Sequence, residues 1–282
     1  MRHPAQAETF SGLISAQNTD GGWGYLANTP SSTEPTALTV LALLSNDSSR
    51  ARGLHWLDRH RLPDGGWPPN PSVPHSTWVT AVALLARSGA IPASDPAIEW
   101  LLHQTGRETS WLERTRRFLT SGSSGEDEGG HGWPWFPGAA AWVSPTVFSV
   151  LALSRIRPIS TPISNRIHQG RQYLLTHTCR DGGWNHGSSR ALGYDADSYP
   201  ETTGQALLAF SPGTAPAVSL TRAEAHIRST TSAQAHAWLK LALRHHNRPL
   251  PAHPPLLPPR TVVDLALLHL ASASNVSLGA SL

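Results

Sequence analysis

The sequence predicts an all-α protein built from repeated helical hairpins. A turn with the sequence Gly-Gly-Trp or Gly-His-Gly-Trp recurs along the chain, with an amphipathic segment before it and an apolar segment after it. An apolar segment such as TALTVLALL, at 36–44, is hydrophobic on every face, as expected of a helix that other helices surround. The amphipathic segments keep one polar face. Surface helices are therefore expected to alternate with buried ones.

The copies of this repeat share one register. They begin at Asp20, Asp64, Gly130 and Asp181. A shift of 44 residues maps Trp23 onto Trp67 and also maps the Leu-Ala pair at 41–42 onto the pair at 85–86. One shift that aligns two separated features is typical of a true internal repeat.

The fourth copy has a longer loop than the others. It needs a shift of 161 to align Trp184 with Trp23, and a shift of 167 to align Glu201 with Glu34. The difference between the two shifts predicts six extra residues between Trp184 and Glu201. The third copy is lengthened elsewhere, by an insertion at 107–130.

The helices can be predicted in order from these signals. Surface helices are expected within 7–17, 52–62, 95–106 and 167–179, each before a turn. Prolines and hydroxyl residues in TEPT, VSPT and YPETT suit the first turn of the buried helices. Beyond residue 210 the pattern is weaker. It predicts a fifth pair, then an extended connection at 247–259 and a sixth buried helix within 260–274.

Composition excludes several classes of protein. The net charge is only +3 and the basic residues, with Lys240 the single lysine, are spread along the chain, so nucleic-acid binding is not expected. Cys179 is the only cysteine, which excludes an intrachain disulfide and a metal site built from several thiolates. No apolar run reaches about 18 residues, and the N-terminus lacks the apolar core of a signal peptide. A cytoplasmic protein without a transmembrane segment is expected.

The stretches QNTDGGWGY, LPDGGWPP and CRDGGWNHG, each leading into a buried helix, resemble the QW-type repeats of the squalene/oxidosqualene cyclase and prenyltransferase β-subunit superfamily. The resemblance is clear over residues 7–210 and weak over 211–282. It implies a single α/α-toroid domain over 1–282, in which about five to six hairpins form a ring of inner helices inside a ring of outer ones. The chain looks like a small stand-alone member. The weak last repeats predict a gap between the last and first hairpins, which a partner subunit in a homo- or hetero-oligomer would fill.

The resemblance also implies where an acid would act. In class II cyclases the acid motif DxDD lies where an inner helix begins; aligned here, Glu201 falls on the proton-donating aspartate and Thr202 on the next one. This sequence keeps a carboxyl group at the position of the proton donor, but it lacks the full DxDD motif. The zinc site of protein prenyltransferases is not expected, because no cysteine accompanies Glu201. No cofactor is expected, with Mg²⁺ at Asp195 and Asp197 as the alternative.

Glu34 and Glu201 occupy the same repeat position and are the candidate catalytic residues. The equivalent positions in the other copies are Trp78 and Ser144, so capping of the helix alone does not demand an acid there. Two carboxylates near an apolar cavity would split their pKa values and leave one protonated, with Glu201 as general acid and Glu34 as its partner. Further candidates are the threonines that would orient the carboxyls and the side chains that would line the pocket: Thr36, Thr202, Thr203, Trp78, Trp135, Trp142 and His75.

The predicted function is a terpene-cyclase-like reaction on an isoprenoid or similar apolar substrate in the central cavity. Two alternatives stay open from the sequence. One is a non-catalytic toroid that binds a lipid, peptide or protein partner, with the acids serving only as helix caps. The other is a glycan-active enzyme, whose two carboxyl groups would face each other across a polar cleft.

Overall fold

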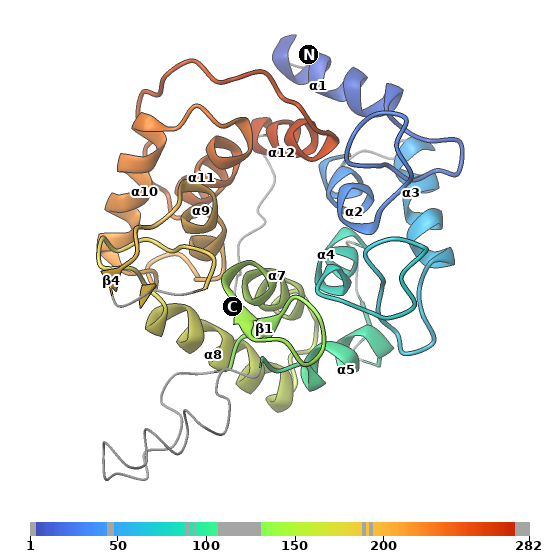
Figure 1. Ribbon diagram of the computed structural model, residues 1–282, viewed down its shortest axis with the longest axis horizontal. Helices are drawn as coiled ribbons and strands as arrows, with labels where there is room; N and C mark the ends of the chain where they lie inside the picture. Colours follow the sequence, from blue (N-terminus) through green and yellow to red (C-terminus); the bar gives the residue numbers. More distant parts are fainter. Residues whose placement is uncertain are drawn as a thin grey trace.

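The structure, a computed structural model, describes residues 4–43, 48–87, 91–92, 94–106, 131–187, 190–191 and 194–273. The predicted insertion at 107–130 lies outside these residues. The regular secondary structure of the described part is almost entirely helical, and its helices form a ring of two layers (Figure 1). The predicted all-α toroid is confirmed.

Buried helices form the inner layer of the ring, as the sequence predicts. They are α2 (Thr33–Ala42), α4 (Val79–Ala86), α7 (Val143–Leu153), α9 (Pro200–Leu208), α11 (Ala233–His245) and α12 (Val262–Ser272). The outer layer consists of α1 (Pro4–Ser15), α3 (Ser48–Arg59), α5 (Pro96–His103), α8 (Thr161–Thr176) and α10 (Ala217–Ser229). Every residue of α4 and α7 is buried, which explains why these segments are apolar on all faces.

Each Gly-Gly-Trp turn joins an outer helix to an inner one in the same way. The indole Nε1 of Trp23 donates to the carbonyl of Leu13 over 2.8 Å, and its backbone N–H donates to Thr36 Oγ1 over 2.9 Å. The indoles of Trp67, Trp133 and Trp184 donate to Leu57, Leu101 and Leu174, and their backbone N–H groups donate to Thr80, Thr146 and Thr203. The four tryptophans are thus equivalent, and the predicted register is confirmed.

The aspartate before each Gly-Gly-Trp turn caps that turn. Asp20, Asp64 and Asp181 each accept a hydrogen bond from the backbone N–H two residues later. Gly21, which follows the first aspartate, has a φ of +93°, a conformation that favours glycine. The turns are therefore structural elements of the repeat.

The inner helices form a closed cycle. Each packs against its neighbours along the chain, and the last one, α12, packs against α2 as well as α1. The backbone N–H of Val262 donates to the carbonyl of Tyr25 over 2.9 Å, and Thr9 Oγ1 lies 3.0 Å from His269 Nδ1. The predicted gap between the last and first hairpins is wrong, because the apolar face of α12 completes the ring within one chain.

The extended connection predicted before the last helix is confirmed. Residues 248–260 have no regular secondary structure and run along the outside of the ring from α11 to α12, where a sixth outer helix would lie (Figure 1). The N–H of Leu257 donates to the carbonyl of Thr231 over 2.8 Å, and the ring of His253 lies 4.2 Å from that of His236 on α11. The connection is therefore held against the inner layer.

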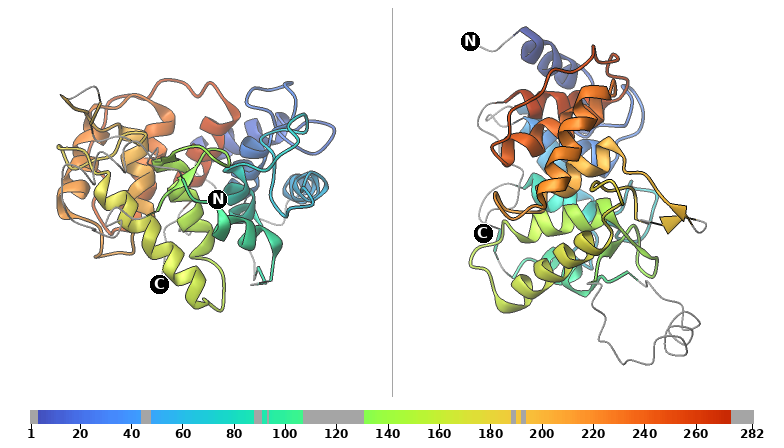
Figure 2. Two further views of the ribbon diagram at one scale, coloured as in Figure 1. Left: turned by 60° about the horizontal axis from the view of Figure 1, so that its bottom comes forward. Right: turned by 90° about the vertical axis from the view of Figure 1, so that its left-hand side faces the viewer.

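Two short antiparallel strand pairs interrupt the helices. β1 (Trp133–Pro134) pairs with β2 (Ala141–Trp142), and β3 (Arg190–Ala191) pairs with β4 (Tyr194–Asp195). The second pair lies in the lengthened loop of the fourth copy, where Trp184 and its hydrogen-bonding partner Thr203 are 19 residues apart instead of the 13 of the other copies. The predicted six-residue insertion is thus confirmed, and the β3–β4 pair projects from the body of the ring (Figure 2).

Candidate functional site

The candidate acids lie at the start of two inner helices. Glu34 is the second residue of α2, and Glu201 is the second residue of α9. Ser144 and Gln234 occupy the second position of α7 and α11. Both glutamates are half-buried, so each carboxyl group is partly removed from water.

Glu201 accepts two hydrogen bonds from side-chain amides. Oε1 accepts from Gln234 Nε2 over 3.1 Å and from Gln205 Nε2 over 3.5 Å. Gln205 is itself buried, and its Oε1 accepts from Ser144 Oγ over 2.7 Å. A chain of side chains therefore runs from α7 through α9 to α11. Because both amides bind the same oxygen of Glu201, the other oxygen, Oε2, is the one suited to carry a proton.

Glu34 is held by a different partner. Its Oε2 accepts a hydrogen bond of 2.5 Å from the hydroxyl of Tyr25, which lies two residues after Trp23 in the same copy of the repeat. Burial raises the pKa of Glu34, although the bond from Tyr25 works against this rise. Burial and the neighbouring carboxylate of Glu34 also raise the pKa of Tyr25.

The two glutamates influence each other electrostatically. Burial raises the pKa of Glu201, and the negative charges of Glu34 and of Asp264, on the first turn of α12, raise it further. Asp264 is held in a capping box with Thr261. Three carboxyl groups from α2, α9 and α12 thus interact at one end of the inner ring, and the protonated form of Glu201 is favoured there.

The threonines next to the acids have another role than the predicted one. Thr36 Oγ1 and Thr203 Oγ1 accept from the backbone N–H groups of Trp23 and Trp184. Thr202 Oγ1 donates to the carbonyl of Trp184 over 2.6 Å. The expectation that these hydroxyls orient the carboxyls is wrong, because the buried backbone of the tryptophan turn takes their hydrogen bonds.

Two of the predicted aromatic residues lie together and a third does not. Trp78 and Trp135 are in edge-to-face contact, with ring centroids 4.7 Å apart. Phe148 continues the group, 5.5 Å from Trp78 and 5.7 Å from Trp238 on α11. These contacts join α4, α7 and α11 in the interior of the ring, and Trp238 is 1% exposed.

Trp142 and His75 lie away from that aromatic group. Trp142 is 38% exposed, and its ring lies 6.5 Å from that of His186, which in turn lies 5.1 Å from the ring of Tyr199. His75 is exposed in the loop before α4. Among the described residues, the side-chain hydrogen bonds of Glu34 and Glu201 come from Tyr25, Gln205 and Gln234 and not from Trp142 or His75.

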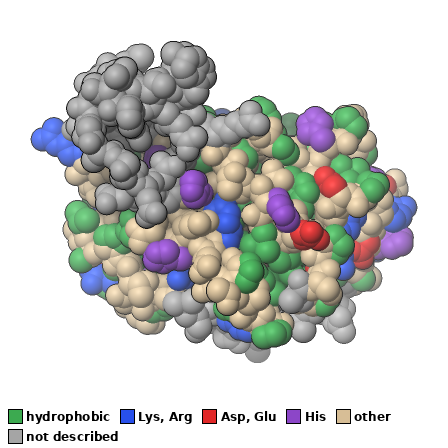
Figure 3. All heavy atoms as spheres, turned by 90° about the horizontal axis from the view of Figure 1, so that it is seen from below, with side chains coloured by type: hydrophobic (Ala, Val, Ile, Leu, Met, Phe, Trp, Pro, Cys, Tyr) green, Lys and Arg blue, Asp and Glu red, His purple; other side chains and the backbone are tan. Residues whose placement is uncertain are grey.

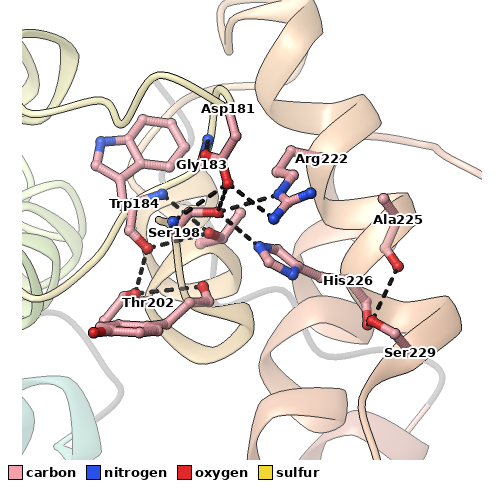
Figure 4. A network of polar contacts seen from close by, with 11 residues as sticks. Asp181, Gly183, Trp184, Ser198, Thr202, Arg222, Ala225, His226 and Ser229 are labelled. Atoms are coloured by element: carbon pink, nitrogen blue, oxygen red, sulfur yellow. Dashed lines mark hydrogen bonds and ion pairs between the residues drawn. The ribbon is translucent and has the colours of Figure 1, made fainter. Parts of the chain in front are cut away.

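A serine, a histidine and an aspartate meet at the fourth turn (Figure 4). Ser198 Oγ lies 2.8 Å from Asp181 Oδ2 and 2.8 Å from His226 Nε2, while Arg222 forms an ion pair of 2.9 Å with the same carboxylate. All of these bonds involve the serine or the aspartate of the fourth turn. The first turn has the same serine–aspartate pair, in which Ser31 donates to Asp20. Ser198 and His226 are buried. Among the described side chains, the aspartate bonds to the serine and the arginine and not to the histidine, which differs from the order of contacts in a catalytic triad, and the group stabilises the turn.

The described residues contain no group of three or more His, Cys, Asp or Glu side chains arranged to bind a metal ion. Of the predicted magnesium ligands, Asp197 is exposed, whereas the side chain of Asp195 lies outside the described part. None of the described helices has the length and hydrophobicity of a membrane span. On the face seen in Figure 3, charged side chains of both signs and histidines are interspersed with hydrophobic ones.

Known structures share this fold at low sequence identity. A protein from Actinoplanes superposes with a TM-score of 0.53 and 18% identity, covering 94% of this chain and 78% of its own. A variant of the type II terpene cyclase MstE from Scytonema, in complex with merosterolic acid A as product, gives a TM-score of 0.52 and 17% identity, covering 95% of this chain and 77% of its own.

A glycosidase variant is equally similar in shape, with a TM-score of 0.52, 12% identity and coverage of 95% of this chain and 81% of its own. Neither a protein-family model nor a curated protein sequence matches the chain. These comparisons show a shared fold alone, and the residues of the site must decide the chemistry.

Sequence reasoning missed three residues of the site, namely Tyr25, Gln205 and Gln234. Gln234 could have been found, because it stands at the second position of its inner helix, as Glu201 does. Tyr25 and Gln205 carry no comparable signal. Their roles depend on how neighbouring copies of the repeat are placed in space.

Proposed function

We propose that the protein is a terpene-cyclase-like enzyme that protonates a carbon–carbon double bond of an isoprenoid or similar apolar substrate, with Glu201 as the general acid. The observation that carries this proposal is the setting of Glu201. It is half-buried, hydrogen-bonded through one oxygen only, and close enough to Glu34 for that charge to raise its pKa. A carboxylic acid whose pKa is raised holds its proton to a higher pH than an ordinary glutamate does, which favours a role as general acid.

In the proposed reaction the protonated Oε2 of Glu201 transfers its proton to one carbon of the alkene. The π-electron pair forms the new C–H bond and leaves a carbocation on the other carbon. A second double bond of the chain attacks this cation, so a C–C bond forms and the charge moves along the substrate. Loss of a proton from the last cation balances the proton delivered, and the product is an isomer of the substrate. No metal takes part in these steps.

Each polar neighbour of Glu201 has a place in this reaction. Gln205 and Gln234 would fix the rotation of the carboxyl group by binding Oε1, while Ser144 fixes Gln205. Glu34, held by Tyr25, would favour the protonated state of Glu201 through its negative charge. The aromatic group of Trp78, Trp135, Phe148 and Trp238 would stabilise the cation through its ring faces.

A second function is favoured by one observation, the contact of Phe148 with Trp238. These side chains are 4% and 1% exposed and meet across the interior of the ring, which leaves less room there for a substrate. In that case the toroid would bind a lipid, a peptide or a protein partner without catalysis. Glu34 and Glu201 would then serve as helix caps.

The test is turnover of a panel of prenyl substrates, namely farnesyl diphosphate, geranylgeranyl diphosphate and squalene, with products separated by mass spectrometry. The expected product has the mass of its substrate. Glu201→Gln should reduce turnover by about a hundredfold or more, because a positioned acid contributes about that factor. The matched control is Glu99→Gln, an exposed first-turn glutamate on the outer helix α5, which should retain full turnover.

Full turnover in Glu201→Gln would overturn the catalytic role. Conversion of none of the panel, together with equal prenyl-chain binding by wild type and Glu201→Gln, would favour the non-catalytic module. Turnover that is lost on chelation and restored by a divalent metal would contradict the metal-free steps.

A further inference from the structure

A pocket lies on the outside of the ring, between the first Gly-Gly-Trp turn and the outer helix α3. Its volume is about 480 Å³, within the range of about 300–1,000 Å³ of small-molecule sites. The turn contributes Thr19, Asp20 and Gly21, and the helix contributes Ala51, Arg52, His55 and Arg59. Figure 1 shows α3 on the outer layer beside this turn. The pocket is thus separate from the acids of the inner helices.

The basic side chains of the pocket share one face of α3. Arg52, His55 and Arg59 are spaced three and four residues apart, so they follow one side of the helix over two turns. All three are exposed. A ligand between the turn and the helix would therefore meet two permanent positive charges and an imidazole.

The arginines are held in position by neutral groups. Arg52 Nη2 donates to the side-chain oxygen of Gln17 and, over 3.2 Å, to Ser49 Oγ. Arg59 Nη2 donates to the backbone carbonyl of Asp20 over 2.9 Å. These bonds engage one nitrogen of each guanidinium. A planar guanidinium has five N–H donors, so Nε and Nη1 of both residues can still bind an anion.

The one carboxylate of the pocket, that of Asp20, accepts its hydrogen bonds from groups other than the two arginines. Asp20 accepts from the backbone N–H of Gly22 over 3.0 Å, from Ser31 Oγ over 2.8 Å and from Trp56 Nε1 over 3.0 Å. Asp20 thus stabilises the turn, as the equivalent aspartates do in their own turns. With one carboxylate against two arginines, the pocket retains a positive charge.

The repeat itself provides an internal comparison. The first turn packs its glycine against Arg52, and the second and fourth turns pack Gly65 and Gly182 in the same way against Pro96 and Val218. These contacts align Arg52 with Pro96 on α5 and with Val218 on α10. Three and seven residues later, where α3 has His55 and Arg59, α5 has Glu99 and His103. At the same two positions α10 has Thr221 and Ala225. The second and fourth turns thus pack against their outer helices without an arginine at any of these three positions. The two arginines and the histidine at these positions are therefore a feature of the first copy that these other copies do not share.

We propose that this pocket binds a phosphate group, with Arg52 and Arg59 as the charged donors and His55 between them. Guanidinium groups match phosphate oxygens with paired N–H donors, and two arginines about two helical turns apart can hold one diphosphate from both ends. The phosphate belongs either to a soluble organic phosphate or to a lipid headgroup. The site does not depend on the function proposed for the inner acids.

The test is calorimetric titration with inorganic diphosphate at low salt. Wild type should bind, and the affinity should fall on raising the salt, because exposed charges are screened. Replacing both arginines by glutamine should weaken binding by about tenfold or more, since each supplies a charge-assisted hydrogen bond. The control is Arg228→Gln, an exposed arginine on α10 that lies outside the pocket. It should bind as wild type does.

Arg52 and Arg59 also hold parts of the fold, so their replacement could weaken binding by destabilising the protein. A second variant tests the pocket without removing these bonds. His55→Glu places a negative charge in the middle of the pocket on an exposed residue, and it should abolish binding with the melting temperature preserved. Co-sedimentation with phosphatidic acid vesicles, against phosphatidylcholine vesicles, separates the two sources of phosphate. Binding of vesicles alone, lost in His55→Glu, would identify the headgroup. Binding of neither probe, or equal binding by wild type and His55→Glu, would overturn the proposal.

Discussion

The hydroxyl of Tyr25 donates a 2.5 Å hydrogen bond to Oε2 of Glu34, and the backbone carbonyl of the same tyrosine accepts from Val262 where α12 begins. One residue thus supports an acid of the candidate site and the junction that closes the ring. The position of Glu34 depends on the last helix of the chain, although the two are far apart in sequence.

Tyr25→Phe should raise the pKa of Glu34. The phenol stabilises the charged carboxylate, so its removal favours the protonated form, which burial already favours. The measurement is an NMR titration of the side-chain carboxyl carbon, assigned with Glu34→Gln. Tyr199→Phe, another exposed tyrosine, is the control. An unchanged or lower pKa in Tyr25→Phe would contradict the hydrogen bond as described.

Glu201 should make folding less favourable as the pH rises. Its pKa in the folded protein lies above the usual value of 4.5, so the folded state holds the proton more tightly than the unfolded state does. The stabilisation is complete below pH 4.5 and is lost as the pH rises through the folded pKa. The free energy of unfolding of wild type should therefore fall relative to that of Glu201→Gln from pH 4.5 upward. A difference that stays constant over that range would refute the raised pKa.

His226 should change the free energy of unfolding with pH in the opposite direction to Glu201. Burial and the charge of Arg222 lower its pKa from 6.5 to about 4, so folding favours the neutral ring. Its contribution is fully present above pH 6.5 and is lost as the pH falls toward 4. His226→Gln should reduce the loss of stability between pH 6.5 and 4, as measured by urea unfolding. The exposed His103 provides the control, and His103→Gln should leave the pH dependence unchanged.

Thr203→Val should destabilise the fold by about 1–3 kcal/mol, because the buried N–H of Trp184 would lose its acceptor. Thr36→Val should have a similar effect through Trp23. Thr221→Val, at an exposed position on α10, should change the free energy of unfolding by about 0.5 kcal/mol or less. Equal effects at the buried and exposed sites would show that the hydroxyls do not hold the turns.

The repeated elements could be predicted from the sequence because each copy supplies the same local signals. Trp184 and Thr203 are bonded as Trp23 and Thr36 are, once six inserted residues are allowed for. The sixth inner helix was also predictable, from its apolar pattern alone.

The contacts between copies could not be predicted in the same way. The bond from Ser144 to Gln205 and those from the two glutamines to Glu201 join residues on α7, α9 and α11. Their distances depend on the spacing of whole helices. For the same reason the sequence does not predict the closure of the ring by α12, because the weak repeat signal of the last segments predicts a gap there.

Ring closure has a consequence for the order in which the chain can fold. Thr9 and His269 are in contact although 260 residues separate them, so α1 cannot complete its packing until the last inner helix has left the ribosome. Until then the nascent chain is an open stack of hairpins with an apolar face at each end. Joining two distant ends costs entropy that grows only slowly with the length between them, whereas the exposed apolar faces are liable to associate with other chains. Synthesis of this protein should therefore pass through a stage in which nearly all of its hairpins exist but the molecule still requires protection from aggregation.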